Sequence, residues 1–206
     1  MSVYSSTPLT HLSAIGFLLL AGCYGATIPK SDNPEAKLQR AHSLVFSEDR
    51  PIPAERMLLD AADIYRERDD QRGLGNAYRQ YAEFLRSPSV GRNPYFRNGF
   101  ANSSVTFDTR EGKAVEYLQK ALSAYAIAEN RLVERGQFDL LSNVYLNVAV
   151  AQLQLGNKAL ACSNYDKSLA AHQRYREQKP SEPLVVPTGY KSFEDVIAVE
   201  RRRANC

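Results

Sequence analysis

Apolar residues recur at helical spacing along most of the chain between residues 35 and 175. They stand three and four positions apart, which is the period of a helix with one buried face, and no alternating strand pattern stands out. The clearest stretch runs from Ser142 to Tyr175, where a turn at Leu155 and Gly156 separates two periodic helices. The pattern predicts an all-α fold built from helical hairpins.

The hairpin at 142–175 resembles a tetratricopeptide repeat (TPR), a helical hairpin of about 34 residues. The positions that match its large and small slots are Tyr145, Val148, Ala149, Ala161, Tyr165 and Ser168. Similar spacing recurs at Leu38, Ala41, His42, Val45, Ala54, Leu58 and Ala61, and again at Tyr78, Tyr81, Ala82, Leu85, Ala114, Leu118, Ala121 and Leu122. The resemblance implies a right-handed superhelical stack of about three TPR-like hairpins over residues 35–175. His42 stands where the family has a small residue, and we expect a tightly packed side chain there.

The middle hairpin is split by an insertion at 87–110. This segment is rich in Gly, Asn, Ser and Pro and shows no helical period. It carries four aromatic residues, which are Tyr95, Phe96, Phe100 and Phe107. Three interpretations remain open, because long loops with aromatic residues are pinned on their scaffold, offered to a partner, or disordered.

The last segment, 176–206, begins with a Pro-rich connector that cannot be a regular helix. A final helix is expected from about Ser192, where Ser192 and Asp195 resemble a capping box. We expect this helix to cap the stack, since a terminal repeat needs one polar face. Its arginines at 201–203 favour the helix C-terminus or, alternatively, contact anionic lipid headgroups.

The N-terminus carries an apolar run from Leu12 to Gly22 that is followed by Cys23. The run is too short to cross a bilayer as a resident helix and is typical of a signal peptide. Residues 20–23, Leu-Ala-Gly-Cys, resemble the lipobox of bacterial lipoproteins, in which the Cys is lipidated and the preceding peptide is removed. The resemblance implies a signal peptide at 1–22 and a lipidated tether at 23–34. The alternative is an ordinary signal peptide or membrane anchor with an incidental Cys.

Tyr24 follows the Cys of this motif. In lipoproteins of Gram-negative bacteria an Asp at that position tends to retain the protein in the inner membrane. The resemblance therefore implies a lipid-anchored protein of the outer membrane that faces the periplasm.

Two further cysteines, Cys162 and Cys206, would then lie in an oxidising compartment, where a remaining pair is often bridged. A possible disulfide is one interpretation. The other is that Cys162 is a small buried residue on a helix and Cys206 a terminal thiol.

Composition argues against several function classes. The 26 basic and 23 acidic residues are scattered, so no broad basic face for nucleic acid is visible. Of the three His, His11 is lost with the signal peptide, and His42 and His172 lie in different repeats. No metal site, cofactor motif or catalytic triad is therefore expected, and we expect no enzymatic activity.

The resemblance places a partner-binding groove along the first helix of each hairpin. Its predicted positions are Gln39, Ser43, Asn76, Arg79, Glu83, Arg86, Asn143, Leu146, Val150 and Leu153. One end is polar and the other apolar, which suits an amphipathic helix or an extended segment. Alternatively, the three apolar residues are covered by the chain itself, for example by the connector at 183–189.

The leading interpretation is a membrane-anchored scaffold that binds another protein as an adaptor or assembly factor of the bacterial envelope. One alternative is a periplasmic immunity lipoprotein that blocks a delivered toxin. Another is an envelope protein that associates with itself.

Overall fold

The computed structural model describes residues 32–182, 186 and 189–206. The predicted signal peptide at 1–22 and the predicted lipidation site Cys23 lie outside these residues. Within the described ranges the chain is all-helical, as predicted, and contains no strand. Among the same residues, none of the helices combines the length and the apolar character that crossing a bilayer requires.

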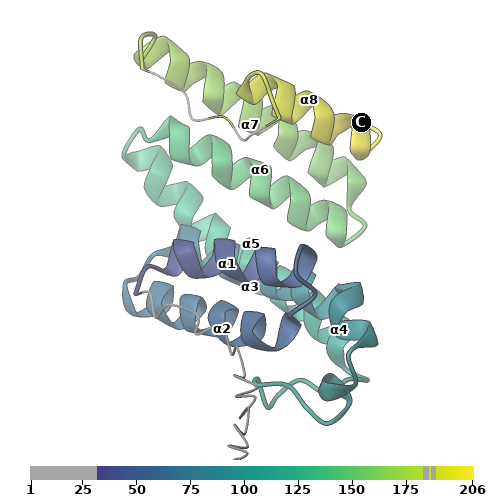
Figure 1. Ribbon diagram of the computed structural model, residues 1–206. Helices are drawn as coiled ribbons and strands as arrows, with labels where there is room; N and C mark the ends of the chain where they lie inside the picture. Colours follow the sequence, from purple (N-terminus) through teal and green to yellow (C-terminus); the bar gives the residue numbers. More distant parts are fainter. Residues whose placement is uncertain (1–31, 183–185, 187–188) are drawn as a thin grey trace, which may run out of the picture. The chain divides into compact units, whose positions relative to one another are not determined.

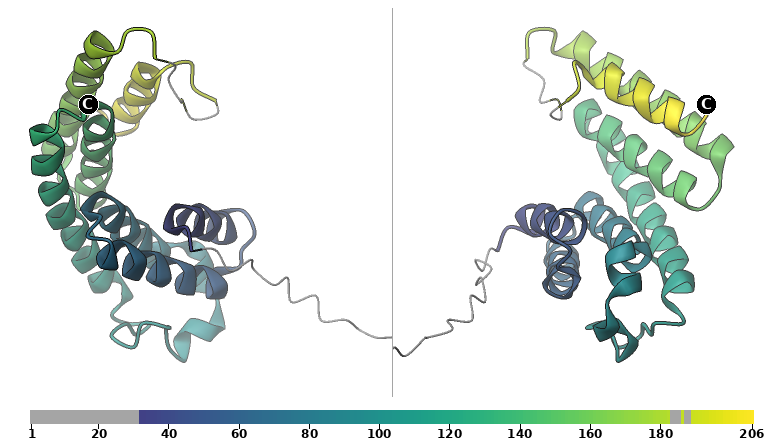
Figure 2. Two further views of the ribbon diagram at one scale, coloured as in Figure 1. Left: turned by 90° about the vertical axis from the view of Figure 1, so that its left-hand side faces the viewer. Right: turned by 45° about the vertical axis from the view of Figure 1, so that its right-hand side comes forward.

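The long helices pack in pairs that follow the chain order (Figures 1 and 2). The pairs are α1 (Pro34–Phe46) with α2 (Pro51–Glu67), α3 (Gln71–Arg86) with α5 (Arg110–Glu134), and α6 (Phe138–Gln154) with α7 (Lys158–Gln178). The last helix, α8 (Phe193–Arg203), packs on α7. Successive pairs also contact one another, because α2 packs on α3 and α5 on α6. The first helices of the pairs meet as well, α1 with α3 and α3 with α6.

Three of the turns between helices share one backbone geometry. In the α2–α3, α5–α6 and α6–α7 turns, the middle residue has a positive φ, with values of 51° at Asp69, 64° at Gly136 and 81° at Gly156. The next N–H donates to a carbonyl five residues earlier in each turn, at 2.9 Å for Asp70, 3.0 Å for Gln137 and 2.8 Å for Asn157. This is the left-handed helix ending that glycine favours, and it reverses the chain within three residues.

Small residues are buried on the packing faces of the helices. Ala41, Ala54, Ala61, Ala77, Ala121, Ala149 and Ala161 are all fully buried. Gly75 is packed even more tightly, since a Cβ there would lie 2.6 Å from the ring of Tyr125. Large rings fill the remaining space, with Tyr81, Tyr125 and Tyr165 fully buried. Close approach at small residues and filling by large ones is the pattern expected for packed helices.

Two expectations about individual segments differ from the structure. His42 is exposed and contacts the exposed Phe46 ring at 4.7 Å, so the expected tight packing is wrong. The first half of the insertion is not irregular, because it forms the short helix α4 (Pro88–Arg92) and the 3₁₀ helix η1 (Pro94–Arg97). Local turn chemistry explains both elements, since Ser87 and Asn93 cap them and a proline follows each cap.

Candidate binding surfaces

The predicted groove positions lie on α1, α3 and α6, and their exposure differs. Gln39 and Asn143 are exposed, whereas the other eight are half-buried. The charged positions, Arg79, Glu83 and Arg86, are all among the half-buried ones. Their contacts within the chain determine which polar groups are left for a partner to contact.

A polar network joins α3 to α6 at the predicted groove. Arg79 and Glu83 form an ion pair on α3. Glu83 also accepts a 2.7 Å hydrogen bond from Nε2 of Gln154 on α6, and Arg86 donates at 3.0 Å to the Gln154 carbonyl. Asn76 also makes a contact within the chain, because its Oδ1 accepts a 2.8 Å hydrogen bond from the Tyr125 hydroxyl of α5. Burial raises the pKa of Tyr125 to about 12, so this hydroxyl remains a donor at neutral pH.

The apolar end of the predicted groove is partly covered by the chain itself. Leu146 and Leu153 pack against a buried cluster that contains Tyr165 of α7 and Ile197 of α8. Leu146 and Leu153 therefore both pack within the chain, which was one of the two interpretations for them. Among the described residues the covering element is α8, whereas most of the connector at 183–189 lies outside them. Val150 is half-buried and is not part of that cluster.

The four aromatic residues of the insertion have different environments. Phe96 is fully buried, with ring centroids 5.7 Å from Phe84 and 4.8 Å from Phe100. The Phe107 ring contacts the guanidinium groups of Arg97 and Arg110, which lie 4.8 and 4.2 Å from its centroid. Tyr95 is 44% exposed and meets Phe96 only by its edge. Phe96, Phe100 and Phe107 are thus pinned on the scaffold, and Tyr95 faces solvent.

A buried carboxylate fixes the second half of the insertion. Glu55 of α2 is 1% exposed and accepts hydrogen bonds from the backbone N–H of Ala101 (2.9 Å) and of Asn102 (3.2 Å). It also accepts a 3.0 Å bond from the Tyr81 hydroxyl of α3. Burial and the nearby Glu55 carboxylate raise the pKa of Tyr81 above its ordinary value.

Glu55 is not among the site residues predicted from the sequence, although the sequence carries a signal for it. Glu55 precedes Leu58, Leu59 and Ala62 by three, four and seven positions, so it lies in the apolar stripe of its helix. A buried carboxylate in such a stripe requires hydrogen-bond donors, which Tyr81 and the insertion provide.

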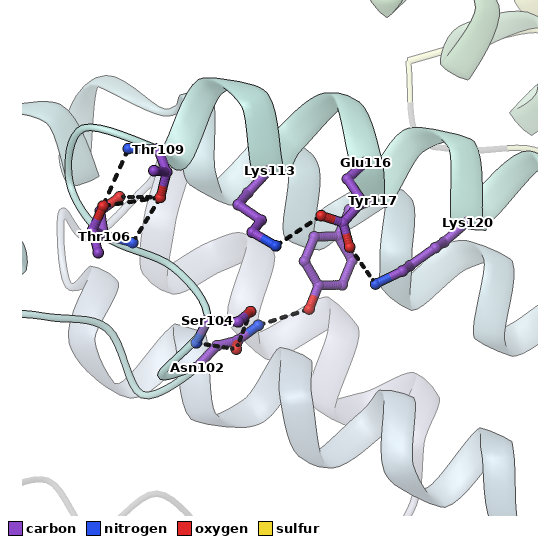
Figure 3. Close-up of polar contacts among 8 residues, drawn as sticks. All are labelled: Asn102, Ser104, Thr106, Thr109, Lys113, Glu116, Tyr117 and Lys120. Carbon is purple, nitrogen blue, oxygen red and sulfur yellow. Dashed lines mark hydrogen bonds and ion pairs between the residues drawn. The ribbon is translucent and has the colours of Figure 1, made fainter.

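Asn102 joins the same loop to α5 (Figure 3). Its Nδ2 donates a 2.7 Å hydrogen bond to the hydroxyl of Tyr117, and its Oδ1 accepts from the backbone N–H and hydroxyl of Ser104. Next to Tyr117 on α5, Glu116 lies between Lys113 and Lys120, which lower its pKa to about 2. The loop is therefore held between α2 and α5 by specific polar contacts.

A cavity of about 320 Å³ lies beside this fixed loop. Residues of α2, α3 and α5 line it together with loop residues 101–103. The rings of Tyr78, Tyr81 and Tyr117 form one wall, with Tyr117 at 5.6 Å from Tyr78 and 4.7 Å from Tyr81. We call this the tyrosine pocket.

Cys162 of α7 and Cys206 at the chain end form a disulfide. The disulfide was one of the two interpretations for these cysteines, and it is the one that the structure contains. It ties the residues after α8 to α7, and an ion pair between Arg201 and Asp166 lies beside it.

Comparisons with protein families, with curated proteins and with solved structures found no match. Within the described residues, no cluster of three or more His, Cys, Asp or Glu is arranged to hold a metal ion. The contacts, burial and charges above are therefore the basis for proposing a function.

Proposed function

We propose that this chain is a TPR-like repeat scaffold that binds a protein partner while anchored to a bacterial membrane by a lipid on Cys23. The observation that carries the proposal is the turn geometry shared by the α2–α3, α5–α6 and α6–α7 connections, together with the contacts of α1 with α3 and of α3 with α6. Repeated turns and side-by-side first helices are what a stack of helical repeats requires.

The face formed by these first helices is the proposed contact surface. Of the ten predicted groove positions, Gln39 and Asn143 are the exposed ones, and both are neutral. The charged positions are paired, Arg79 with Glu83 and Arg86 with Glu111. A surface of this kind favours an uncharged or mixed polar segment of a partner rather than a strongly acidic or basic one.

The proposed location is the periplasmic face of the outer membrane. The lipobox-like residues 20–23, followed by Tyr24, support it. The disulfide between Cys162 and Cys206 fits an oxidising compartment, because such bonds are rare where thiols are kept reduced.

The contact surface is tested by affinity capture from cross-linked cell envelopes. The variant Gln39→Arg with Asn143→Arg places bulk and charge at two exposed positions of the proposed face, so the fold is expected to persist. Leu146 and Leu153 are unsuitable, since charging them would disrupt a buried cluster.

The matched control is Ala126→Arg with Ala170→Arg, at exposed positions of α5 and α7. We expect the control to retain the partner and the test variant to lose it. Equal capture by both variants would show that the first-helix face is not the contact surface.

The anchor is tested by Cys23→Ala. The variant is expected to move from the membrane to the soluble fraction, because stable anchoring requires the acyl chains. Continued membrane association would contradict the lipid attachment.

A further inference from the structure

The tyrosine pocket is distinct from the first-helix face. On α3 its residues are Ala77, Tyr78 and Tyr81. The predicted groove positions of that helix, which include Arg79 and Glu83, follow a neighbouring stripe. A ligand in this cavity would therefore occupy a second site.

The pocket has an aromatic and aliphatic lining. Leu58, Leu59 and Ala62 of α2 line it together with the three tyrosine rings. The hydroxyls of two rings are engaged, since Tyr81 donates to Glu55 and Tyr117 accepts from Asn102. Such walls bind rings, because aromatic pairs in edge or offset contact gain stabilisation beyond the area they bury.

The charges at the pocket cancel. Of its lining residues, all in the part of the chain that the structure describes, Asp63 and Arg66 alone are charged, and they form an ion pair. Arg66 also donates a 3.2 Å hydrogen bond to the Tyr78 hydroxyl. A charged ligand would find no unpaired opposite charge among these lining residues, so the pocket favours a neutral one.

The wall formed by the insertion is fixed before any ligand arrives. Glu55 holds the backbone of Ala101 and Asn102, and Asn102 reaches Tyr117 on α5. A preformed cavity avoids the cost of ordering a loop on binding. Its volume of about 320 Å³ is at the lower end for small-molecule sites and suits a single ring system.

We propose that the tyrosine pocket binds an uncharged aromatic ring of about the size of an indole. The ring belongs either to a free small molecule or to an aromatic side chain of a bound polypeptide. Asn102 and Ser103 on the loop, together with the Asp63–Arg66 pair, supply polar atoms among the lining residues for the polar part of the ligand.

The probes are indole, for the free molecule, and N-acetyl-L-tryptophanamide, for a side chain within a polypeptide. The chain contains no Trp, so fluorescence excited beyond tyrosine absorption comes from the probe alone. Titrating the full folded protein into a fixed low concentration of each probe should give a saturable blue shift of its emission. Binding of the capped amino acid points to a side chain, and binding of indole alone to a small molecule, and either result supports the site.

Two variants locate the binding. Ala62→Phe fills the cavity from α2 and should weaken binding by about tenfold or more, because the ring occupies the site. Ala170→Phe, the same change at an exposed position of α7, should leave binding unchanged. Tyr117→Leu should weaken it about two- to tenfold by removing one ring contact. Helical circular dichroism checks that each variant is folded.

Three results would overturn the proposal. The first is the absence of a saturable shift with either probe. The second is equal binding by folded Ala62→Phe and Ala170→Phe. The third is displacement of the tryptophan probe by N-acetyl-L-leucinamide at equal concentration, since an aliphatic side chain would then serve as well. None of these results depends on the first-helix face or its partner.

Discussion

The Tyr81 hydroxyl on α3 donates a 3.0 Å hydrogen bond to the carboxylate of Glu55 on α2, and both side chains are buried. The same carboxylate accepts two backbone N–H groups of the insertion. One acidic residue thus links the first hairpin, the second hairpin and the loop that lines the tyrosine pocket.

Replacing Glu55 with Ala should destabilise the protein by about 2–4 kcal/mol, because it removes the acceptor of the buried Tyr81 hydroxyl and of two part-buried backbone N–H groups. Amide hydrogen exchange at Ala101 and Asn102 should accelerate more than at α7. Urea denaturation and exchange mass spectrometry measure the two effects. The exposed Glu134→Ala serves as the control, and if both variants unfolded at the same urea concentration, Glu55 would have no anchoring role.

Gly75→Ala should destabilise the protein even though alanine is the better helix former by about 1 kcal/mol. The new Cβ would lie 2.6 Å from the buried Tyr125 ring, so the packing cost of about 1–3 kcal/mol exceeds the gain. Gly112→Ala on α5 meets open space and should be neutral or stabilising. Thermal unfolding compares the two, and a raised melting temperature for Gly75→Ala would refute the close contact.

Reducing the disulfide should lower stability. Cys162 and Cys206 are separated by 44 positions, for which the loss of chain entropy in the unfolded state corresponds to about 4 kcal/mol. We expect the double variant Cys162→Ser, Cys206→Ser to unfold at lower temperature than the oxidised protein and to be insensitive to reductant. A melting curve of the wild type that reductant does not shift would argue against the bridge.

Acidification should weaken the packing of α8 on α7 through His172. Burial and Arg176 lower the pKa of His172, and Glu194, whose Oε1 lies 3.3 Å from Nε2, only partly opposes this. The folded protein therefore favours the neutral ring, which also stacks on Phe193 at 4.6 Å. This contribution to stability is present above the unfolded pKa of 6.5 and is lost as the pH falls through the lower folded value.

Unfolding free energies measured near pH 7.5 and near pH 5 test this linkage. The loss on acidification should be smaller in His172→Phe than in the wild type. His42→Phe, at an exposed position of α1, should behave as the wild type does. An identical pH dependence in all three proteins would remove His172 as the cause.

The all-helical character and the pairing of neighbouring helices could be predicted because both depend on local patterns. Apolar spacing sets which face of each helix is buried, and consecutive helices usually pack together, as α3 and α5 do even across the insertion. The last helix was predicted from the caps near its start, and Ser192 does accept a 3.2 Å bond from the Asp195 N–H. The second hydrogen bond of a capping box would run from the Ser192 N–H to the Asp195 carboxylate. In the structure, the Asp195 carboxylate accepts instead from the Lys191 N–H.

The candidate sites were less predictable because they depend on contacts between distant parts of the chain. Arg79 and Glu83 were expected to face a partner, yet Gln154, 71 positions beyond Glu83, uses the same carboxylate. Leu146 and Leu153 pack into a cluster that α8 completes. No local pattern specifies which distant side chain satisfies a polar group or covers an apolar one.

The sequence by itself determined the long helices, their order and the small residues on their packing faces, since each follows from spacing along one segment. Only the tertiary structure decided that Glu55 and Asn102 hold the insertion against α2 and α5, which leaves a cavity beside three tyrosines. The reason is physical, because a buried carboxylate must find donors, and only the folded chain brings the N–H groups of Ala101 and Asn102 within reach.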